Sequence, residues 1–371
     1  MTPYILVVAK WRDDVFAGLF FEGLPPDLRR HIRIAEFGRE PLTTALAGAA
    51  AVIVMRHGLF SFGHLAASAG WARVPRYYFL DDNYMLLQEE PELYGSFWSK
   101  YSDAGVRRAL SGFDGVLLGS PALRQYFADR ALHPRLIDYP PIAWPILRTR
   151  TRGWARERGE PFRIAFFGGE HRRDLFATLV YPAAQRLAAD RLVELVLVGI
   201  DPATLPPRAG NLRIVHLPYE LRYGAALDTL ARHNIDVLAH PTPSSRNNPY
   251  KNANVLINAR AFGAVGVLSK LPPYDTLPAP AQAVLCDNDS QAWYDALTRL
   301  IRDPQLCADT FDRADRFCQA EFSGRPNADA IARMLAVHPA PDSMMRITRA
   351  VLAGPALGFD RALVRAKALL R

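Results

Sequence analysis

Long apolar runs, paired cysteines and low-complexity tracts are all missing from this chain of 371 residues. No segment approaches the roughly 20 consecutive apolar residues of a membrane-spanning helix, and the apolar start of the chain is too short for a secretory signal. The three cysteines form no C-x-x-C pair, which favours reduced, buried thiols over a disulfide framework. We therefore expect a cytoplasmic protein that is neither secreted nor integral to a membrane.

Signatures of several function classes are missing as well. The net charge is +8, but basic and aromatic residues are spread along the chain rather than clustered, which argues against a nucleic-acid partner. The sequence contains no Walker phosphate loop, no G-x-S-x-G motif and no His/Cys spacing typical of a metal site. No G-x-G-x-x-G follows an expected strand, so a dinucleotide-dependent oxidoreductase is disfavoured. We expect no cofactor and no metal.

The composition, in contrast, suits a folded two-domain protein. Half of the residues are hydrophobic and 22% are charged, and the length favours two domains over one. Short apolar runs alternate with helical stretches, which is typical of parallel sheets covered by helices on both faces. The expected strands are Tyr4–Ala9, Ile32–Phe37, Ala51–Met55, Tyr77–Leu80, Gly115–Leu118, Arg163–Phe167, Leu195–Val198, Arg213–Leu217, Ile235–Ala239 and Val265–Ser269. The expected helices include Val106–Leu110, Leu175–Ala189, Tyr223–Arg232, Asn254–Phe262 and Gln291–Arg302.

A proline-rich and then arginine-rich segment at about 145–160 divides the two series of strands. Prolines deny ladder hydrogen bonds and a charged stretch builds no core, so this segment is expected to be a linker. We predict an α/β protein with two doubly wound, Rossmann-like domains facing a cleft, at residues 1–147 and 160–325, and a helical tail at 326–371. Ligands of open parallel sheets bind beyond the carboxyl ends of the strands, so candidate sites are sought there.

The loop His240–Asn254 follows the expected strand Ile235–Ala239 and enters a helix. Free backbone N–H groups and the helix dipole favour a phosphate at such a place, and Lys251 adds one of only five lysines in the chain. Lys251, Asn254 and Asn258 have the spacing of one helical face, where Asn amides are candidates to bind ribose hydroxyls. The alternative is an exposed, Asn-capped loop with a solvated lysine.

A second candidate is the turn after Arg163–Phe167. Its two glycines let the backbone approach a ligand closely, and its two arginines suit a diphosphate, although Gly-Gly turns are also common in parallel sheets. The candidate donor-binding residues from both places are Gly168, Gly169, Arg172, Arg173, Arg246, Lys251, Asn254 and Asn258.

Candidate catalytic groups follow strands of the first half. Asp81 and Asp82 come directly after one strand and His57 follows another, where each could orient or deprotonate an acceptor hydroxyl. The alternative is that Asp82 or Asn83 caps the following helix. The segment Lys10–Asp14 is a further candidate to bind the acceptor.

Three stretches resemble the retaining GT-B glycosyltransferases of glycosyltransferase family 4. Asp114–Phe127 is similar to the last strand and helix of their acceptor domain, and Phe162–Gly169 to the opening strand and glycine turn of their donor domain. Pro249–Ser269, with Lys251, is similar to their donor-binding helix and following strand. The resemblance implies transfer of a sugar from a nucleotide-sugar donor to a glycan or glycolipid acceptor, with retention, without a metal and in cell-surface polysaccharide synthesis.

The same resemblance implies that Lys251 and Arg172 or Arg173 neutralise the leaving diphosphate. Two departures qualify it. Tyr250 and Asn258 stand where the family often carries a pair of glutamates, and no lysine follows the adjacent Arg172 and Arg173. The alternative function is therefore a non-catalytic GT-B-like protein that binds nucleotide, sugar or a partner enzyme.

The tail is basic. Residues 345–371 hold six Arg and Lys residues and one Asp, so they contribute five of the eight net positive charges. A basic amphipathic helix can lie on an anionic membrane surface, which would place the protein peripherally on the inner face of a membrane. The alternative is a closing helix packed back across the first domain.

Overall fold

A computed structural model describes residues 3–9, 15–36, 45–46, 48–56, 74–94, 101–143, 153–155, 157, 159–169, 172–220, 222–277 and 283–336. These residues form two compact units. The first unit contains the described residues up to Ile142, the short segment Pro249–Asn252 and the described residues from Gly324 onward. The second contains those from Ala143 to Asn248 and from Ala253 to Ser323.

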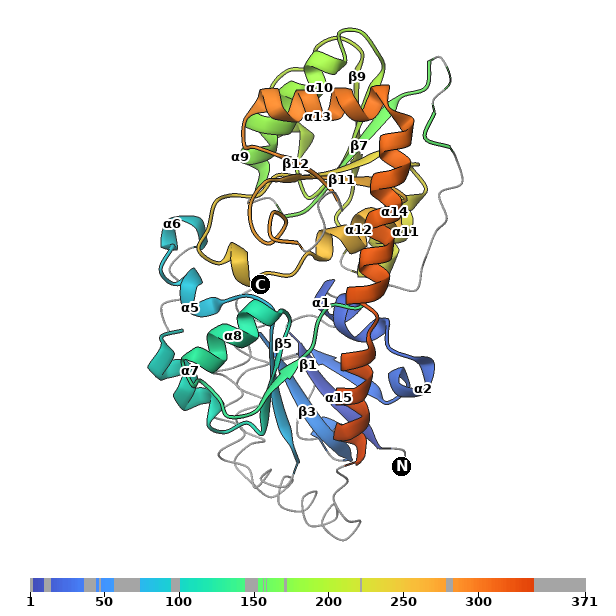
Figure 1. The fold of residues 1–371 in the computed structure, drawn as a ribbon. Helices are drawn as coiled ribbons and strands as arrows, with labels where there is room; N and C mark the ends of the chain where they lie inside the picture. The colour runs from blue at the N-terminus through green and yellow to red at the C-terminus, as the bar shows by residue number, and fades with distance from the viewer. Residues whose placement is uncertain are drawn as a thin grey trace. The chain divides into compact units, whose positions relative to one another are not determined.

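The first unit is built on a parallel sheet of six strands in the order β2-β1-β3-β4-β5-β6 (Figure 1). Its strands are β1 (Tyr4–Ala9), β2 (Ile32–Glu36), β3 (Ala49–Met55), β4 (Arg76–Leu80), β5 (Gly115–Leu118) and β6 (Leu136–Asp138). Every residue of β3 and of β5 is buried, because helices cover both faces of a doubly wound sheet. The five strands expected here are confirmed, and β6 was not predicted.

Helices of this unit start at recognisable signals. Ser102 and Ser120 precede α7 and α8, and each hydroxyl accepts a hydrogen bond from a backbone N–H of the first turn. The described helical segments are α1 (Val15–Ala17), η1 (Gly18–Glu22), α2 (Pro26–Arg29), α5 (Tyr84–Leu87), α6 (Pro91–Tyr94), α7 (Asp103–Leu110), α8 (Pro121–Asp129) and α15 (Arg325–Ala336).

The second unit has its own parallel six-stranded sheet, in the order β12-β11-β10-β7-β8-β9. Its strands are β7 (Phe162–Phe167), β8 (Val193–Val198), β9 (Leu212–Leu217), β10 (Val237–His240), β11 (Val265–Ser269) and β12 (Val284–Cys286). Its helical segments are α9 (Arg173–Leu175), η5 (Phe176–Val180), α10 (Tyr181–Leu187), η6 (Pro202–Thr204), α11 (Tyr223–Ala231), α12 (Asn254–Phe262), α13 (Ser290–Arg302) and α14 (Pro304–Glu321), and η7 (Asn248–Tyr250) connects it to the segment Pro249–Asn252. The expected strands and helices of this half are confirmed within a few residues, and β12 and α14 were not predicted.

The last described helix helps to distinguish the two interpretations of the tail, a helix on a membrane surface or a closing helix packed on the first domain. Helix α15 packs on β1 and β3 of the first sheet and buries Ile331 and Met334 (Figure 1). The beginning of the predicted tail is therefore a structural helix of the first unit. The basic residues 345–371 lie outside the described residues, so the membrane prediction stays a prediction.

Each sheet has a point where the chain reverses its direction of strand addition. In the first sheet, β2 and β3 lie on opposite sides of β1. In the second sheet, the chain proceeds from β7 outward to β9 and then returns to place β10 on the other side of β7. Loops diverge at such switch points, so the carboxyl ends of β1 and β3 and of β7 and β10 are the preferred ligand sites.

The cysteines behave as expected from their spacing. Cys286, Cys307 and Cys318 are free and buried. Burial raises the pKa of the Cys286 and Cys318 thiols to about 12, so neither is a reactive thiolate near neutral pH.

Candidate functional site

Arg172 lies at the switch point of the second sheet, in the turn between β7 and α9. Its Nη1 lies 2.7 Å from Nε2 of His240, the last residue of β10, and donates to the carbonyl oxygen of Pro241 at 3.0 Å and to Oγ1 of Thr242 at 3.2 Å. A guanidinium has no acceptor, so His240 Nε2 accepts this hydrogen bond. The arginine predicted to bind the donor diphosphate is thus fixed by the strand on the other side of the switch point.

A closed set of hydrogen bonds holds Thr242 in turn. Its backbone N–H donates to Ser269 Oγ at 2.8 Å, Ser269 Oγ donates to Asn288 Oδ1 at 2.6 Å, and Asn288 Nδ2 donates to the Thr242 carbonyl oxygen at 2.9 Å. Thr242 and Ser269 are buried, and the ring of Tyr274 stands edge-on to that of His240 at 5.9 Å between centroids. These residues connect the ends of β10, β11 and β12.

The glycine turn after β7 is tightly packed. Gly199, which follows β8, has φ of +86°, and a Cβ added to it would lie 1.8 Å from the carbonyl oxygen of Gly168. Only glycine has both the conformation and the space that this contact requires. Gly168 and Gly169 therefore lie where the sequence placed them, beside the loop that follows the neighbouring strand.

The remaining predicted donor-binding residues lie on several different segments of the chain. Arg173 points to Asp174, with 2.9 Å between Nη2 and Oδ1, and Arg246 is exposed. Asn254 is the first residue of α12, and Asn258 accepts a hydrogen bond from the Tyr223 hydroxyl. The structure therefore groups Arg172, rather than Arg173, with the residues at the switch point, and the nucleotide-binding roles stay predictions.

Lys251 requires a correction. We expected it to share a helical face with Asn254 and Asn258, but α12 begins only at Asn254. Lys251 belongs to the segment Pro249–Asn252, which packs with the first unit, and its Nζ lies 3.9 Å from Asp82 Oδ1. The spacing argument failed because the turn at η7 and the residues after it interrupt the helix.

Tyr250, in the same segment, also packs against the first unit. Its carbonyl oxygen accepts a hydrogen bond from Ser120 Oγ at 2.5 Å, and its ring meets Tyr126 edge-on at 5.2 Å. Ser120 thus serves both as the N-cap of α8 and as the anchor of this segment. Together with the Lys251–Asp82 ion pair, these contacts bring residues 249–252 to the carboxyl ends of β4 and β5.

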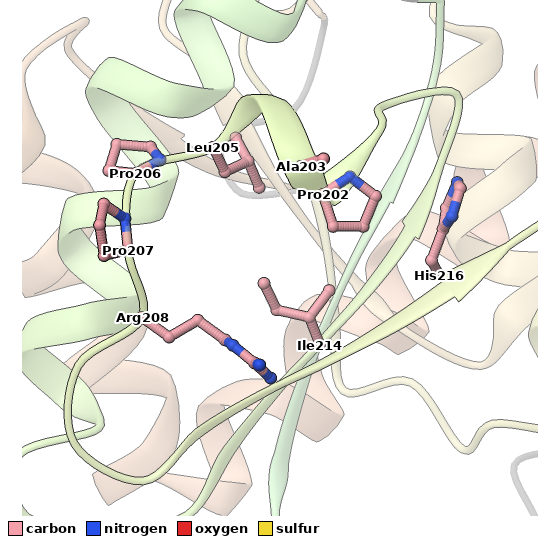
Figure 2. A pocket seen from close by; sticks show the side chains of 8 residues that line it. All are labelled: Pro202, Ala203, Leu205, Pro206, Pro207, Arg208, Ile214 and His216. Carbon is pink, nitrogen blue, oxygen red and sulfur yellow. The ribbon is translucent and has the colours of Figure 1, made fainter.

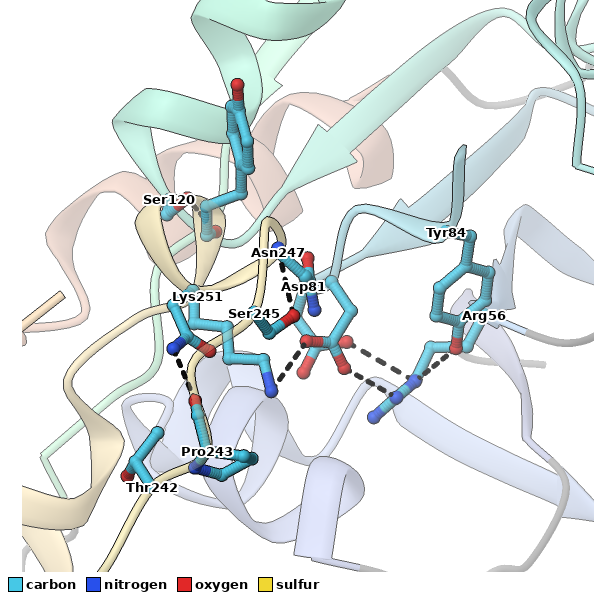
Figure 3. A network of polar contacts seen from close by, with 12 residues as sticks. Arg56, Asp81, Tyr84, Ser120, Thr242, Pro243, Ser245, Asn247 and Lys251 are labelled. Carbon is cyan, nitrogen blue, oxygen red and sulfur yellow. Dashed lines mark hydrogen bonds and ion pairs between the residues drawn. The ribbon is translucent and has the colours of Figure 1, made fainter. Parts of the chain in front are cut away.

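Arg56 is the centre of the candidate site in the first unit (Figure 3). It follows β3 at the switch point, and its Nε lies 3.3 Å from Asp81 Oδ1 while its Nη2 lies 2.9 Å from Asp82 Oδ2. Nε also donates to the Tyr84 hydroxyl at 2.6 Å. The two predicted catalytic carboxylates are therefore brought together by a guanidinium that the sequence analysis did not select.

The backbone around Arg56 is unusual as well. Its φ of +46° lies in the left-handed region, which is uncommon for a residue other than glycine. The Tyr78 hydroxyl donates to the Arg56 carbonyl oxygen at 2.8 Å, and the ring of Phe16 lies 3.7 Å from the guanidinium carbon. Such backbone strain persists where surrounding contacts over-determine a position, and it is frequent at functional sites.

The two carboxylates have different surroundings. The Asp81 side chain is 7% exposed and that of Asp82 is 20% exposed. Burial raises the pKa of Asp81 to about 7, against the lowering effect of Arg56 and with a further raising effect of the Asp82 charge. Gly119 packs against Asp81, and a Cβ added to Gly119 would lie 2.9 Å from the Asp81 Cβ. A carboxyl with this pKa can exchange a proton near neutral pH.

Other sequence expectations for this unit have mixed outcomes. Asn83 occupies the N-cap of α5 but makes no side-chain cap hydrogen bond, so the capping alternative fails for Asn83. His57 and the segment Lys10–Asp14 lie outside the described residues. In the part of the chain that the structure describes, no group of three or more His, Cys, Asp and Glu side chains is placed to hold a metal ion.

Sequence reasoning selected the loop that begins at His240 but gave no role to His240 or Thr242, and it did not select Arg56. Arg56 and His240 each stand at the end of an expected strand, which was the available signal, but nothing in the sequence indicated their partners. Ser269 and Asn288 were missed because they act on Thr242 rather than on a ligand.

One described pocket, of about 460 Å³, has neither Arg56 nor Arg172 among its lining residues (Figure 2). Its lining residues are Pro202, Ala203, Leu205, Pro206, Pro207 and Arg208, with Ile214 and His216 of β9. Since β9 is the edge strand on the far side of β8, this pocket is separate from the Arg172 cluster. None of the described helices has both the length and the apolar character needed to cross a membrane.

No protein-family model and no curated protein matches the chain. Solved structures do. Anabaena Alr3699/HepE in complex with UDP-glucose is 16% identical with a TM-score of 0.61, over 90% of this chain and 99% of that one. The same protein in complex with UDP and glucose is 15% identical with a TM-score of 0.60, over 91% of this chain and 100% of that one. TarM is 13% identical with a TM-score of 0.51, over 78% of this chain and 55% of that one. At these identities the likeness concerns the fold, and it confirms the predicted GT-B architecture of two Rossmann-like domains.

Proposed function

We propose that this protein is a glycosyltransferase that moves a sugar from a nucleoside-diphosphate sugar to a glycan or lipid-linked acceptor. The observation that carries the proposal is Arg172, held at the switch point between β7 and β10 of a Rossmann-like sheet. Dinucleotides and nucleotides bind at this position in such sheets, with their phosphates near helix N-termini. The fold is shared with a protein solved with UDP-glucose, which makes a UDP-sugar the first donor to test.

The chemistry of transfer assigns Arg172 its role. Cleavage of the glycosyl–diphosphate bond places negative charge on the leaving group and oxocarbenium character on the sugar. A preorganised guanidinium stabilises that charge in the transition state, and the N-terminus of α12, whose N-cap Ala253 makes no side-chain cap hydrogen bond, is a second donor of N–H groups. We therefore infer a transfer that needs no metal, with retention of configuration as in the family that the sequence resembles.

The first unit supplies the acceptor side of the proposal. Asp82 is the more exposed carboxylate and is proposed to orient the acceptor hydroxyl, and Asp81 is the neighbouring group whose pKa allows proton exchange. Arg56 keeps both in place. The acceptor itself is proposed to be a cell-surface polysaccharide or glycolipid precursor, handled at the inner face of a membrane to which the basic tail binds.

A thermal-shift screen with UDP, GDP, dTDP and CMP tests the donor assignment. A ligand that binds the folded state alone stabilises it by about 2.7 kcal/mol at a concentration 100 times its Kd. We expect one nucleotide to raise the melting temperature of the wild type and to have a much smaller effect on Arg172→Gln. Absence of a shift with every nucleotide would refute the proposal.

The second candidate is a GT-B-like protein that binds a nucleotide without catalysis. It is favoured by Tyr250 and Asn258, which replace the glutamate pair of the resembled family and are engaged with Ser120 and Tyr223 in this structure. Release of UDP from a bound UDP-sugar in the presence of acceptor would distinguish the two. Nucleotide binding with no such release, over a panel of sugars and acceptors, would favour the second candidate.

A further inference from the structure

We propose that His240 is a positioning residue, which holds the guanidinium of Arg172 in the orientation that meets the donor phosphates. The inference rests on the proposed function and adds a residue that the donor assignment did not contain. His240 ends β10, and its Nε2 makes the shortest of the three hydrogen bonds of Arg172 Nη1, at 2.7 Å.

The physical reason is preorganisation. A free arginine side chain carries about 2 kcal/mol of rotamer entropy, which a ligand would have to overcome on binding. Hydrogen bonds from Nη1 to three successive residues, 240–242, restrict that freedom before the ligand arrives. The acceptors stay in place because Ser269 and Asn288 fix Thr242 on both its N–H and its carbonyl group.

The imidazole must be neutral to do this. Its Nε2 accepts from Arg172, so the ring proton of the neutral form is on Nδ1. A protonated ring would turn an N–H toward the guanidinium and add a like charge beside it. Arg172 is hydrogen-bonded to His240 and the ring of Tyr274 packs edge-on against it, and burial raises the pKa of Tyr274, which keeps the phenol uncharged. Acid should therefore release Arg172 from this orientation.

The experiment compares His240→Phe, which keeps a ring but loses the acceptor, with His240→Gln, which restores an acceptor that does not titrate. Arg172→Gln is the reference variant, and His216→Phe is the matched control, since His216 is an exposed histidine on the edge strand β9. Calorimetry measures the affinity of each protein for UDP and for uridine. Uridine lacks the phosphates and so reports the rest of the nucleotide site.

We expect His240→Phe to weaken UDP binding about tenfold while uridine binding stays unchanged, because a charge-assisted hydrogen bond is lost. The double variant with Arg172→Gln should be no worse than Arg172→Gln alone, since His240 acts through Arg172. His240→Gln and His216→Phe should bind UDP as the wild type does. As the pH is lowered, the wild type should lose UDP affinity relative to His240→Gln.

Two results would overturn the inference while leaving the proposed function intact. In the first, Arg172→Gln loses UDP affinity and His240→Phe does not. In the second, His240→Phe weakens UDP and uridine equally and its effect adds to that of Arg172→Gln, as a packing role would.

If the wild type binds no nucleotide, the proposed function fails, and nitrogen NMR of the guanidinium decides the positioning role separately. An Arg172 N–H signal that exchanges slowly in the wild type and rapidly in His240→Phe supports it. Equal exchange in both proteins overturns it.

Discussion

Replacement of Asp81 by asparagine should change how the stability of this protein depends on pH. The Asp81 carboxyl is buried, and its pKa is raised from 3.8 to about 7, mainly by that burial. Between these two values the folded chain keeps the proton and the unfolded chain releases it. Raising the pH through this interval therefore lowers the free energy of unfolding, whereas below about pH 4 the contribution is fully present.

The expected magnitude follows from the same shift. A gap of about three pKa units corresponds to about 4 kcal/mol. An asparagine has nearly the same shape and does not titrate, so subtracting the unfolding free energy of Asp81→Asn removes the contribution of every group that titrates independently of Asp81. The wild type should therefore lose up to about 4 kcal/mol relative to Asp81→Asn between about pH 4 and pH 7.

Urea denaturation at a series of pH values gives this difference directly. Asp129→Asn is a suitable control, because Asp129 lies at the exposed end of α8. Curves for wild type and Asp81→Asn that run parallel from pH 4 to pH 8 would mean that Asp81 ionises normally. The proposed role of Asp81 in proton exchange would then have no physical basis.

Three further predictions concern the packing of the donor turn, the contact of Lys251 and the tail. Gly199→Ala should destabilise the fold by more than about 2 kcal/mol, because the added Cβ would overlap the Gly168 carbonyl oxygen. Gly153→Ala is the control and should not lower the melting temperature, because a Cβ added there has no atom within 4 Å. Lys251→Ala should lower kcat and leave the Kd for UDP within about twofold of the wild-type value, because the ammonium group of Lys251 contacts Asp82. If the variant instead lost affinity for UDP but not for uridine, Lys251 would belong to the donor site. Full-length protein should co-sediment with anionic vesicles at low salt and be released at high salt, and failure to bind at low salt would refute membrane attachment through the basic tail.

Most of the strands that the sequence predicted correctly share one physical property, and the partly buried edge strands β2 and β9 are the exceptions. Strands buried on both faces, such as Ala49–Met55 and Gly115–Leu118, are apolar throughout, so they leave an uninterrupted run in the sequence. The missed strands, Leu136–Asp138 and Val284–Cys286, are three-residue strands at sheet edges and are only partly buried. Neither burial nor length gives such strands a signal.

The residues of the candidate site were likewise predicted only in part. The sequence alone pointed to the strand ends at which the candidate residues lie, including Asp81, Asp82 and Arg172, because parallel sheets present their loops there. It also placed Lys251 on a helix face, on the assumption that regular spacing continues upstream of Asn254. The helix itself was expected at Asn254–Phe262, where the structure has it, but the local sequence did not determine which unit Lys251 joins.

What only the tertiary structure decided is which of these groups meet. Arg56 contacts Asp81 and Asp82 because β3 and β4 are neighbours in the sheet, and Arg172 contacts His240 because the chain returns to place β10 beside β7. Strand order is set by the packing of whole layers, which no local pattern records. Hydropathy therefore determined most of the strands and their ends, whereas the order of the strands determined which polar side chains meet in the proposed chemistry.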